Sequence, residues 1–272
     1  MSLTIAKLLK SAESELDVSD TPRLDVWILL SFASNKPRSW LLANSSHEAS
    51  TVIGSSSLSY FEYLVKRRAS GVPISFLTGN KEFYGFNFIV TKHTLIPRPE
   101  SETIVQEAIS STPQDSKLLD VGTGTGAIAV SIAANRPDLK VYACDNSPQA
   151  IKIAQKNAHH HQVKVKIEHS DLISIYKNET FQTITANLPY LPNSYSSKLD
   201  LQFEPASALL GGEDGLDIYR RFFQQLKNVS SSMIIVEHLP NQKNKMDKIA
   251  YLNSLKPIKS LSDLCSVYSS NK

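Results

Sequence analysis

The fold of this chain is decided by the stretch Lys117-Leu118-Leu119-Asp120-Val121-Gly122-Thr123-Gly124-Thr125-Gly126-Ala127-Ile128-Ala129. A short apolar run is followed by three alternating glycines and then by a segment rich in alanine and isoleucine. This order predicts a buried parallel strand, a tight turn and the first turns of a helix. Glycines in such a turn let the backbone bend sharply and let a ligand come close to it. We therefore predict that the turn cradles a cofactor.

Asp120 indicates which cofactor the turn would bind. The glycines alone also satisfy the dinucleotide fingerprint G-x-G-x-x-G/A, in which Ala127 takes the last position. A carboxylate just before Gly122 would repel a pyrophosphate, but it would attract a ligand that carries an ammonium and a sulfonium group. The loop contains no Lys or Arg to hold phosphates. S-adenosylmethionine therefore fits better than NAD, and a strand-turn-helix without a ligand is the alternative.

The composition is typical of a globular protein that works in a reducing compartment. The chain has 272 residues, of which 41% are hydrophobic and 20% charged, and this length is ample for a buried core. A net charge of +3 is far from a nucleic-acid signature. Cys144 and Cys265 lack the spacing of a disulfide framework or a zinc site. Because no apolar run reaches 18 residues, we expect a cytoplasmic protein without a membrane partner.

The N-terminal part predicts a small helical domain over residues 1–75. Its apolar residues recur at helical spacing, and turns with Asp, Ser and Pro separate the groups. Next to it, an alternation of aromatic and polar residues that breaks at Gly85 predicts a linking β-hairpin within residues 76–100. A helix is expected from Glu102 to Ile109. The apolar residues at helical spacing are Ile5, Leu8, Leu9, Leu24, Trp27, Ile28, Leu29, Leu30, Leu58, Phe61, Leu64 and Val65.

Residues 101–272 predict an α/β domain, because strand and helix patterns alternate from Leu118 onward. Such alternation is typical of a parallel sheet with helices on both faces. The consecutive histidines His159 to His161 cannot share one helix face, so we interpret them as a solvated helix end and expect no metal site. The expected strands, with a helix in each interval, are 118–121, 141–144, 163–167 and 183–186. A loop region (191–215), a helix (216–226), a strand (233–237) and two short strands within 258–268, one of them antiparallel, follow.

Two acidic positions extend the predicted cofactor site. Asp145 stands at the end of the second strand, about 20 residues after Gly122, where a carboxylate can accept hydrogen bonds from both hydroxyls of a ribose. Because Ser147 and Pro148 already supply the cap and first turn of the next helix, we expect Asp145 to be free for the ligand. After the third strand, Asp171 could accept from the amine of an adenine that Leu172 covers. An ordinary aspartate turn is equally compatible with those two residues.

The tetrapeptide Asn187-Leu188-Pro189-Tyr190 follows the fourth strand, at the edge where open α/β sheets bind their substrates. The side-chain carbonyl of Asn187 and the backbone carbonyl of Leu188 can accept both hydrogens of one planar NH2 group, while Tyr190 covers its plane. This arrangement suits an amide or an exocyclic amine. The alternative is a turn that only ends the strand.

The glycine turn, Asp145 and the Asn-x-Pro-Tyr tetrapeptide, in this order, resemble class I S-adenosylmethionine-dependent methyltransferases that modify a planar nitrogen. Nearly the whole chain is similar to the protein-glutamine N5-methyltransferases that act on peptide chain release factors. Three further stretches carry this closer resemblance: Gly71-Val72-Pro73 with Phe83-Tyr84-Gly85; Leu95-Ile96-Pro97-Arg98-Pro99-Glu100-Ser101-Glu102; and Glu204-Pro205 with Leu209-Leu210-Gly211-Gly212-Glu213-Asp214-Gly215-Leu216.

The resemblance implies a helical substrate-recognition domain, a linking β-hairpin and a seven-stranded, Rossmann-like methyltransferase domain. It also implies methylation of the glutamine in the Gly-Gly-Gln motif of a release factor, with no direct nucleic-acid binding. The chain departs from the family at Leu188, where the family usually has proline, and at Ser101, where it has threonine. The alternatives are a ribosomal-protein glutamine methyltransferase, an adenine-N6 nucleic-acid methyltransferase, and a cofactor-binding scaffold without activity.

We accordingly assign catalysis to Asn187 and Tyr190, and substrate binding to the whole tetrapeptide. The predicted cofactor-binding residues are Asp120, Gly122, Thr123, Gly124, Thr125, Gly126, Asp145, Asp171, Leu172 and Asn187.

Overall fold

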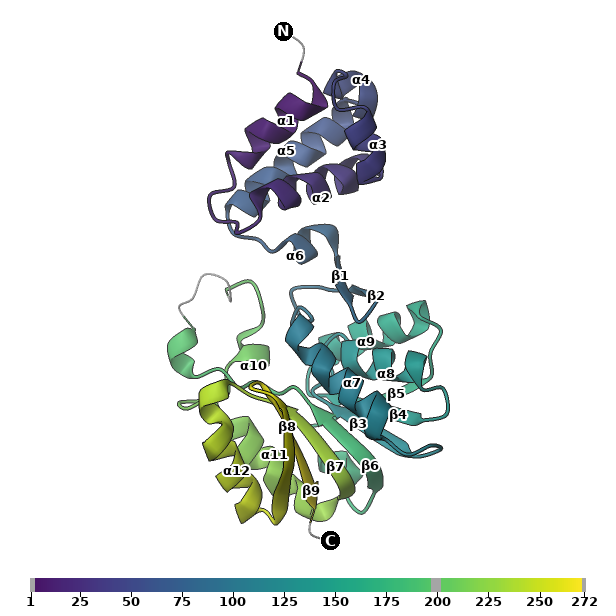
Figure 1. The fold of residues 1–272 in the computed structure, drawn as a ribbon, viewed down its shortest axis with the longest axis vertical. Coiled ribbons are helices and arrows are strands. Elements are labelled where there is room, and N and C mark those ends of the chain that lie inside the picture. Colours follow the sequence, from purple (N-terminus) through teal and green to yellow (C-terminus); the bar gives the residue numbers. More distant parts are fainter. Residues whose placement is uncertain (1–2, 197–201, 271–272) are drawn as a thin grey trace. The chain divides into compact units, whose positions relative to one another are not determined.

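The computed structural model describes residues 3–196 and 202–270, and the chain divides into two compact units, Met1–Gly79 and Asn80–Lys272 (Figure 1). The boundary follows the helical segments and precedes the first strand of the hairpin. The described part of the chain contains no helix that is both long and apolar enough to cross a membrane.

The first unit is helical, as predicted. Its core forms where α1, α2 and α5 turn their apolar faces toward one another around Leu8, Leu29 and Phe61. The buried carboxylate of Asp25 accepts a hydrogen bond from Arg68 Nε at 2.7 Å, which links α2 to α5. The helices are α1 (Ile5–Glu13), α2 (Pro22–Ser34), α3 (Arg38–Ala43), α4 (Ala49–Ile53), α5 (Ser55–Ala69) and α6 (Ile74–Thr78).

The second unit begins with the predicted hairpin, formed by β1 (Asn80–Phe83) and β2 (Phe86–Ile89). Its turn uses Tyr84 and Gly85, both at positive φ, which is the conformation that a tight hairpin turn requires. The hairpin packs on α9 (Pro148–His160), where His161 contacts the Phe88 ring with the ring centroids 5.1 Å apart. Thus His159 and His160 are exposed at the helix end, as expected, whereas His161 belongs to a packing contact.

The described residues of the second unit form a seven-stranded sheet, which confirms the predicted fold. The strand order is β5-β4-β3-β6-β7-β9-β8; the first five are parallel, and β9 runs antiparallel to both of its neighbours. The strands are β3 (Lys117–Val121), β4 (Lys140–Asp145), β5 (Val165–His169), β6 (Thr180–Ala186), β7 (Ser230–Glu237), β8 (Leu255–Ser262) and β9 (Cys265–Ser270).

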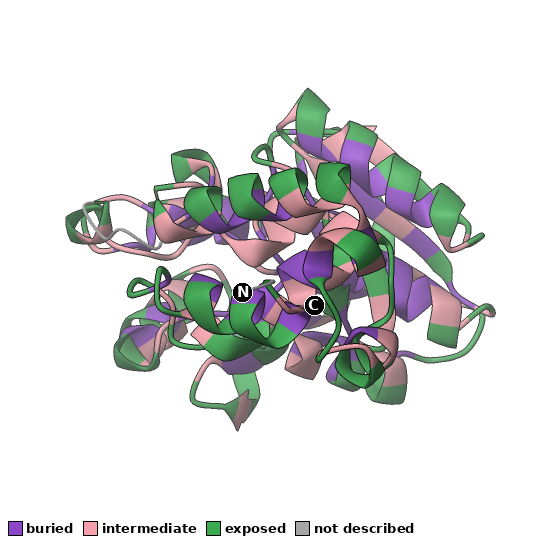
Figure 2. Ribbon diagram, turned by 90° about the horizontal axis from the view of Figure 1, so that it is seen from above, coloured by how far each residue is buried: buried purple, intermediate pink, exposed green. Residues whose placement is uncertain are grey.

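Helices cover both faces of this sheet. Helices α7 (Glu102–Ser111), α8 (Ala127–Asn135) and α9 lie on one side, and α11 (Asp217–Gln225) and α12 (Lys243–Leu252) on the other (Figure 1). Because side chains alternate along a strand, Leu118 and Leu119 enter two different apolar cores. Figure 2 shows buried and exposed residues alternating along the helices, as expected for helices that have one face on the sheet and the other in solvent. Cys144 and Cys265 are buried, free thiols within strands.

The prediction of a helix between the third and fourth parallel strands is wrong. The chain between β5 and β6 has only the 3-10 turn η2 (Ser174–Tyr176). Leu172 and Asn178 adopt positive φ on either side of it, a conformation that a continuing right-handed helix excludes. The expected loop 191–215 contains the short elements η3 (Asn193–Tyr195) and α10 (Ala206–Leu209), and its residues 197–201 lie outside the described part of the chain.

Candidate active site

The glycine turn joins β3 to α8 and rests on a buried carboxylate. Asp120 is 1% exposed and accepts hydrogen bonds from Thr123 Oγ1 at 2.6 Å and from Thr185 Oγ1 at 2.8 Å. Burial raises the pKa of Asp120 to about 6, although both hydroxyl bonds act in the opposite direction. Asp120 therefore holds the turn through Thr123 and joins it to β6 through Thr185.

The three glycines of the turn serve different contacts. A Cβ atom at Gly122 would lie 2.8 Å from Leu188 Cδ2, so this position packs against the tetrapeptide. At Gly126 the added atom would lie 3.1 Å from Ala154 Cβ, so that position packs against α9. Only Gly124, at φ +56°, has open space where a Cβ would stand. Of the three, Gly124 is the glycine that leaves room for a ligand.

A pocket of about 370 Å³ opens at the carboxyl ends of the parallel strands, within the usual range of about 300–1,000 Å³ for small-ligand sites. It brings together residues from four strand ends that sequence analysis had assigned separately. A smaller hollow of about 50 Å³ shares Asn187 with it, and Ser101, Thr123 and Thr125 line this second space. The predicted site residues that line the larger pocket are Gly122, Gly124, Asp145, Asp171, Leu172, Asn187, Leu188 and Pro189.

Asp145 lies in the pocket wall, but the expectation that its carboxylate is free is wrong. Its Oδ2 accepts from the Gly124 N–H and its Oδ1 from the Ser147 N–H, both at 2.9 Å. Burial raises the pKa of this carboxyl. The predicted cap is confirmed, because Ser147 Oγ accepts from the Ala150 N–H. Asp145 thus holds the glycine turn in place, and its carboxylate, which also accepts from the Asn146 N–H, keeps acceptor capacity for a ligand.

Asp171 and Leu172 follow β5 and line the pocket. Asp171 forms an ion pair with Arg221 Nη2 at 2.5 Å, and about half of each side chain is exposed. Leu172 is buried at positive φ and contributes to the pocket lining. The carboxylate that we expected to accept from an adenine amine therefore already has a cationic partner.

The tetrapeptide after β6 belongs to a buried hydrogen-bond chain. Asn187 Nδ2 donates to Ser101 Oγ at 2.8 Å, and Ser101 Oγ donates to Glu237 Oε2 at 2.7 Å. The Tyr190 hydroxyl donates to the other oxygen, Glu237 Oε1, at 2.9 Å. Burial raises the pKa of the Glu237 carboxyl, while the bonds from Ser101 and Tyr190 lower it. Both assigned catalytic residues thus connect to one carboxylate.

Sequence analysis missed Glu237 as part of the site. Glu237 directly follows the apolar run Met233–Val236, so it stands at the carboxyl end of a predicted strand, as Asp120 and Asp145 do. This position could have identified it as a site residue. For Ser101, sequence analysis identified only the departure from the threonine of the family. Their contact spans 136 positions in the chain, which no local pattern reports.

A second set of contacts fixes the backbone of the tetrapeptide. The Leu188 N–H donates to the Tyr219 hydroxyl at 3.3 Å, and Tyr219 donates to the Glu237 carbonyl at 2.6 Å. Gly215 abuts the carbonyl of Tyr190 so closely that any side chain there would collide with it. The stretch 209–216, which was quoted above for its resemblance to the family, therefore packs directly against the backbone of the tetrapeptide.

Glu204 connects two other stretches that carried the resemblance. It is buried, accepts from the Ile96 N–H at 2.7 Å, and pairs with the guanidinium of Arg98. Residues 95–102 are thereby joined to Glu204-Pro205, and both segments contribute residues to the pocket wall.

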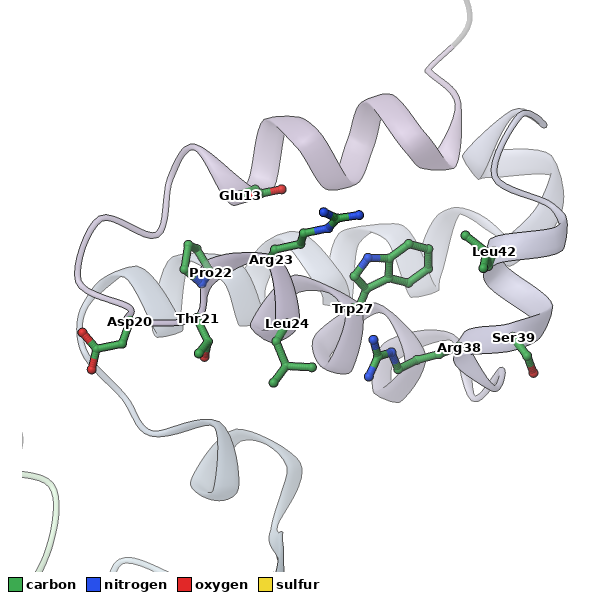
Figure 3. Close-up of a pocket in the computed structure, with 10 residues that line it drawn as sticks. All are labelled: Glu13, Asp20, Thr21, Pro22, Arg23, Leu24, Trp27, Arg38, Ser39 and Leu42. Atoms are coloured by element: carbon green, nitrogen blue, oxygen red, sulfur yellow. The ribbon is translucent and has the colours of Figure 1, made fainter.

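The helical unit has a larger hollow of its own, of about 860 Å³ (Figure 3). Trp27 lies in its wall beside Leu24 and Leu42, which are 42% and 63% exposed. Arg23 and Arg38 form no ion pair with any residue in the described ranges 3–196 and 202–270. The remaining lining residues are Glu13, Asp20, Thr21, Pro22 and Ser39.

Comparison with known proteins gives concordant matches for both units. The family model "PrmC N-terminal domain" matches residues 7–79, and the model "Methyltransferase small domain" matches residues 101–202. The release factor glutamine methyltransferase of Escherichia coli (strain K12) is 36% identical over 236 residues, which cover 85% of this chain and 84% of that protein. The protein of the same name from Coxiella burnetii is 34% identical over 268 residues, covering 96% and 95%.

Among solved structures, the 16S rRNA N2 G1207 methyltransferase RsmC of T. thermophilus, in complex with AdoMet and guanosine, matches with a TM-score of 0.51. The match covers 71% of this chain and 50% of that chain at 14% identity. At this level of identity the likeness concerns the fold.

We expect Asp120→Asn to change the pH dependence of stability. Because the pKa of Asp120 is about 6 in the folded chain against an ordinary 3.8, ionisation favours the unfolded state as the pH rises between these values. The cost reaches about 3 kcal/mol above pH 7. The melting temperature of the variant relative to wild type should therefore rise from pH 4 to pH 7 and then level off.

Thermal unfolding in a pH series measures this difference. Asp138→Asn is the control: because its guanidinium partner Arg136 lowers the pKa of Asp138 from the ordinary 3.8, its contribution to stability changes with pH only around and below that value. The melting-temperature difference for this variant should therefore stay nearly constant from pH 4 to pH 8. A melting-temperature difference for Asp120→Asn that stays constant from pH 4 to pH 8 would contradict the buried, ionising carboxylate.

Proposed function

The chain belongs to the release factor glutamine methyltransferases, and on this basis we propose that it methylates a glutamine of a peptide chain release factor. The methyl group passes from S-adenosylmethionine to the side-chain amide nitrogen, and the target is the glutamine of the Gly-Gly-Gln motif. The observation that carries the proposal is the position of Asn187, which lines both the cofactor pocket and the smaller hollow beside it. The reaction belongs to the cytoplasm, where release factors act.

The pocket at the strand ends suits S-adenosylmethionine, the methyl donor of this family. The open space at Gly124 accommodates a ligand against the glycine turn, and the spare lone pairs of Asp145 suit a ribose diol. Leu172 offers an apolar surface to an adenine ring. Bound there, the cofactor supplies an electrophilic methyl group on a sulfonium sulfur. The carboxylates around the turn, Asp120 and Asp145, favour its positive charge.

The tetrapeptide is suited to hold the substrate amide. An amide nitrogen is a poor nucleophile because its lone pair is delocalised into the carbonyl group. Asn187 and the Leu188 carbonyl would accept both of its hydrogens, aim the nitrogen at the methyl group and stabilise positive charge as it develops. Tyr190 would restrict the plane of the amide. A strong base is not required, because the proton can leave after the methyl group has been transferred.

We assign recognition of the release factor outside its glutamine motif to the helical unit. The hollow of Figure 3 combines exposed apolar side chains with the guanidinium groups of Arg23 and Arg38, which have no ion-pair partner within the described part of the chain. Such a surface suits a region of the release factor in which an apolar side chain has acidic residues beside it.

An assay with labelled S-adenosylmethionine tests the main proposal. We expect label on an intact release factor and none on the variant whose Gly-Gly-Gln glutamine is replaced by alanine. A ribosomal protein and adenine-containing DNA serve as competing substrates in the same assay. Label on either of these, with none on the release factor, would overturn the assignment.

Replacement of Asn187 by alanine should separate turnover from cofactor binding. If Asn187 stabilises charge that develops on the amide nitrogen, kcat should fall by about 100-fold or more. The dissociation constant of S-adenosylmethionine, measured by calorimetry, should change by less than about threefold, because the other pocket residues remain. Equal losses of turnover and of cofactor affinity would assign Asn187 to cofactor binding instead.

The role of the hollow is tested with Leu42→Asp, a change at a position that is 63% exposed. We expect the KM for the intact release factor to rise by about tenfold, as for an interface contact worth more than 1 kcal/mol, with kcat unchanged. Leu252→Asp on α12, at a position 77% exposed, is the matched control. The KM for a short Gly-Gly-Gln peptide should be the same for wild type and both variants; a rise with the peptide would contradict a remote docking site.

A further inference from the structure

We propose that Glu237 and Ser101 orient the side-chain amide of Asn187 so that the site presents hydrogen-bond acceptors alone, and thereby selects an amide NH2 group over a carboxylate. The proposal rests on the proposed function, and it concerns two positioning residues that lie behind the tetrapeptide.

Glu237 determines which group donates in each of these hydrogen bonds. This residue ends β7, is 1% exposed, and each carboxylate oxygen has one hydroxyl partner, Ser101 Oγ at 2.7 Å or the Tyr190 hydroxyl at 2.9 Å. An ionised carboxylate only accepts hydrogen bonds. Both hydroxyl groups must therefore give their single hydrogen to Glu237.

This constraint passes through Ser101 to Asn187. Since the hydroxyl hydrogen of Ser101 is committed to Glu237, its oxygen can only accept from the third partner at 2.8 Å. The Asn187 amide must then turn its NH2 group toward Ser101. The same NH2 group also lowers the pKa of the Glu237 carboxyl, whereas the carbonyl oxygen of Asn187 in that position would be repelled by the carboxylate.

The opposite end of the amide is consequently fixed as well. Asn187 Oδ1 has no hydrogen-bond partner among the described residues, and it is not among their buried unpaired polar atoms. It is therefore accessible, on a residue that lines both hollows. A carbonyl oxygen in this position accepts an N–H from the substrate.

Tyr190 is constrained in the same way. Its hydroxyl hydrogen is given to Glu237, so the hydroxyl can only accept from a substrate group. The Asn187 side chain and the Leu188 carbonyl thus offer acceptors, and Tyr190 has no hydroxyl hydrogen left to donate to the substrate. An NH2 group satisfies acceptors, whereas a glutamate carboxylate would meet them with its own lone pairs and negative charge. One buried carboxylate thereby determines the polarity of the site.

Glu237→Gln tests the inference because it keeps the shape and removes the constraint. The new amide can donate to Ser101, whose hydroxyl can then donate to Asn187 Oδ1 and turn the Asn187 NH2 group toward the substrate. We expect kcat/KM for the release factor to fall by about 100-fold. The dissociation constant of S-adenosylmethionine should stay within about threefold of wild type.

The decisive measurement is discrimination between glutamine and glutamate. A release factor with the Gly-Gly-Gln glutamine replaced by glutamate is used as a competitive inhibitor, and its inhibition constant is compared with the KM of the unaltered factor. In wild type we expect the glutamate form to bind at least about 100-fold more weakly. In Glu237→Gln this ratio should fall about tenfold or more, because a donor now faces the substrate; a general loss of structure would weaken both ligands alike.

Ser101 provides an independent test through a second pair of variants. Ser101→Ala removes the link and should reduce both activity and discrimination, and Ser101→Thr, which keeps the hydroxyl, should restore most of each. Glu107→Gln is the matched control, since Glu107 is a buried carboxylate on α7 that accepts from Ser111 Oγ at 2.6 Å. It should leave the ratio unchanged.

The outcomes separate this inference from the proposed function. If wild type transfers no methyl group to the release factor, the proposed function fails. If wild type is active but both Glu237→Gln and Ser101→Ala leave the glutamine-to-glutamate ratio unchanged, at whatever activity, the inference is overturned while the function stands.

Discussion

A buried carboxylate must be given hydrogen-bond donors, and this requirement organises the edge of the sheet where the site lies. Asp120, Asp145 and Glu237 stand at the carboxyl ends of β3, β4 and β7, and each one takes its donors from another segment of the chain. Asp120 ties the glycine turn to β6, and Asp145 ties the same turn to the start of α9. Glu237 ties β7 to the segment before α7 and to the tetrapeptide. Because the strands are parallel, these attachments converge on one pocket.

The same carboxylates give the pocket its electrical character. Burial raises the pKa of all three, which means that the protein bears a cost for keeping them ionised. A cationic ligand reduces this cost, whereas a pyrophosphate would increase it. The negative charge whose burial is costly is therefore the charge that suits a sulfonium cofactor. Around Glu237 the effect is indirect, since its charge reaches the substrate through the orientation of Asn187.

Local patterns were sufficient for much of this architecture. The glycine turn, the hairpin at Gly85 and the apolar strands follow from residue spacing and backbone preference, so they could be predicted. The missing helix after β5 could not, because it depends on the left-handed conformation of Leu172, which a non-glycine residue adopts only when tertiary contacts require it. The bond from the Gly124 N–H to Asp145 and the link from Ser101 to Glu237 are likewise contacts between separate segments. Sequence analysis located the residues of the pocket more readily than the hydrogen bonds that define what each one can do.

Leu188 shows how such contacts bear on a departure from the family pattern. A proline at this position would stiffen the turn but would lack an N–H group. In this chain the Leu188 N–H donates to Tyr219, which itself donates to the backbone of β7, and the leucine side chain packs against Gly122. The turn is thus held by a buried hydroxyl and by the glycine turn, while the Leu188 carbonyl is still available as an acceptor. The substitution therefore replaces one source of rigidity with another, which favours an active enzyme over a scaffold that has lost its chemistry.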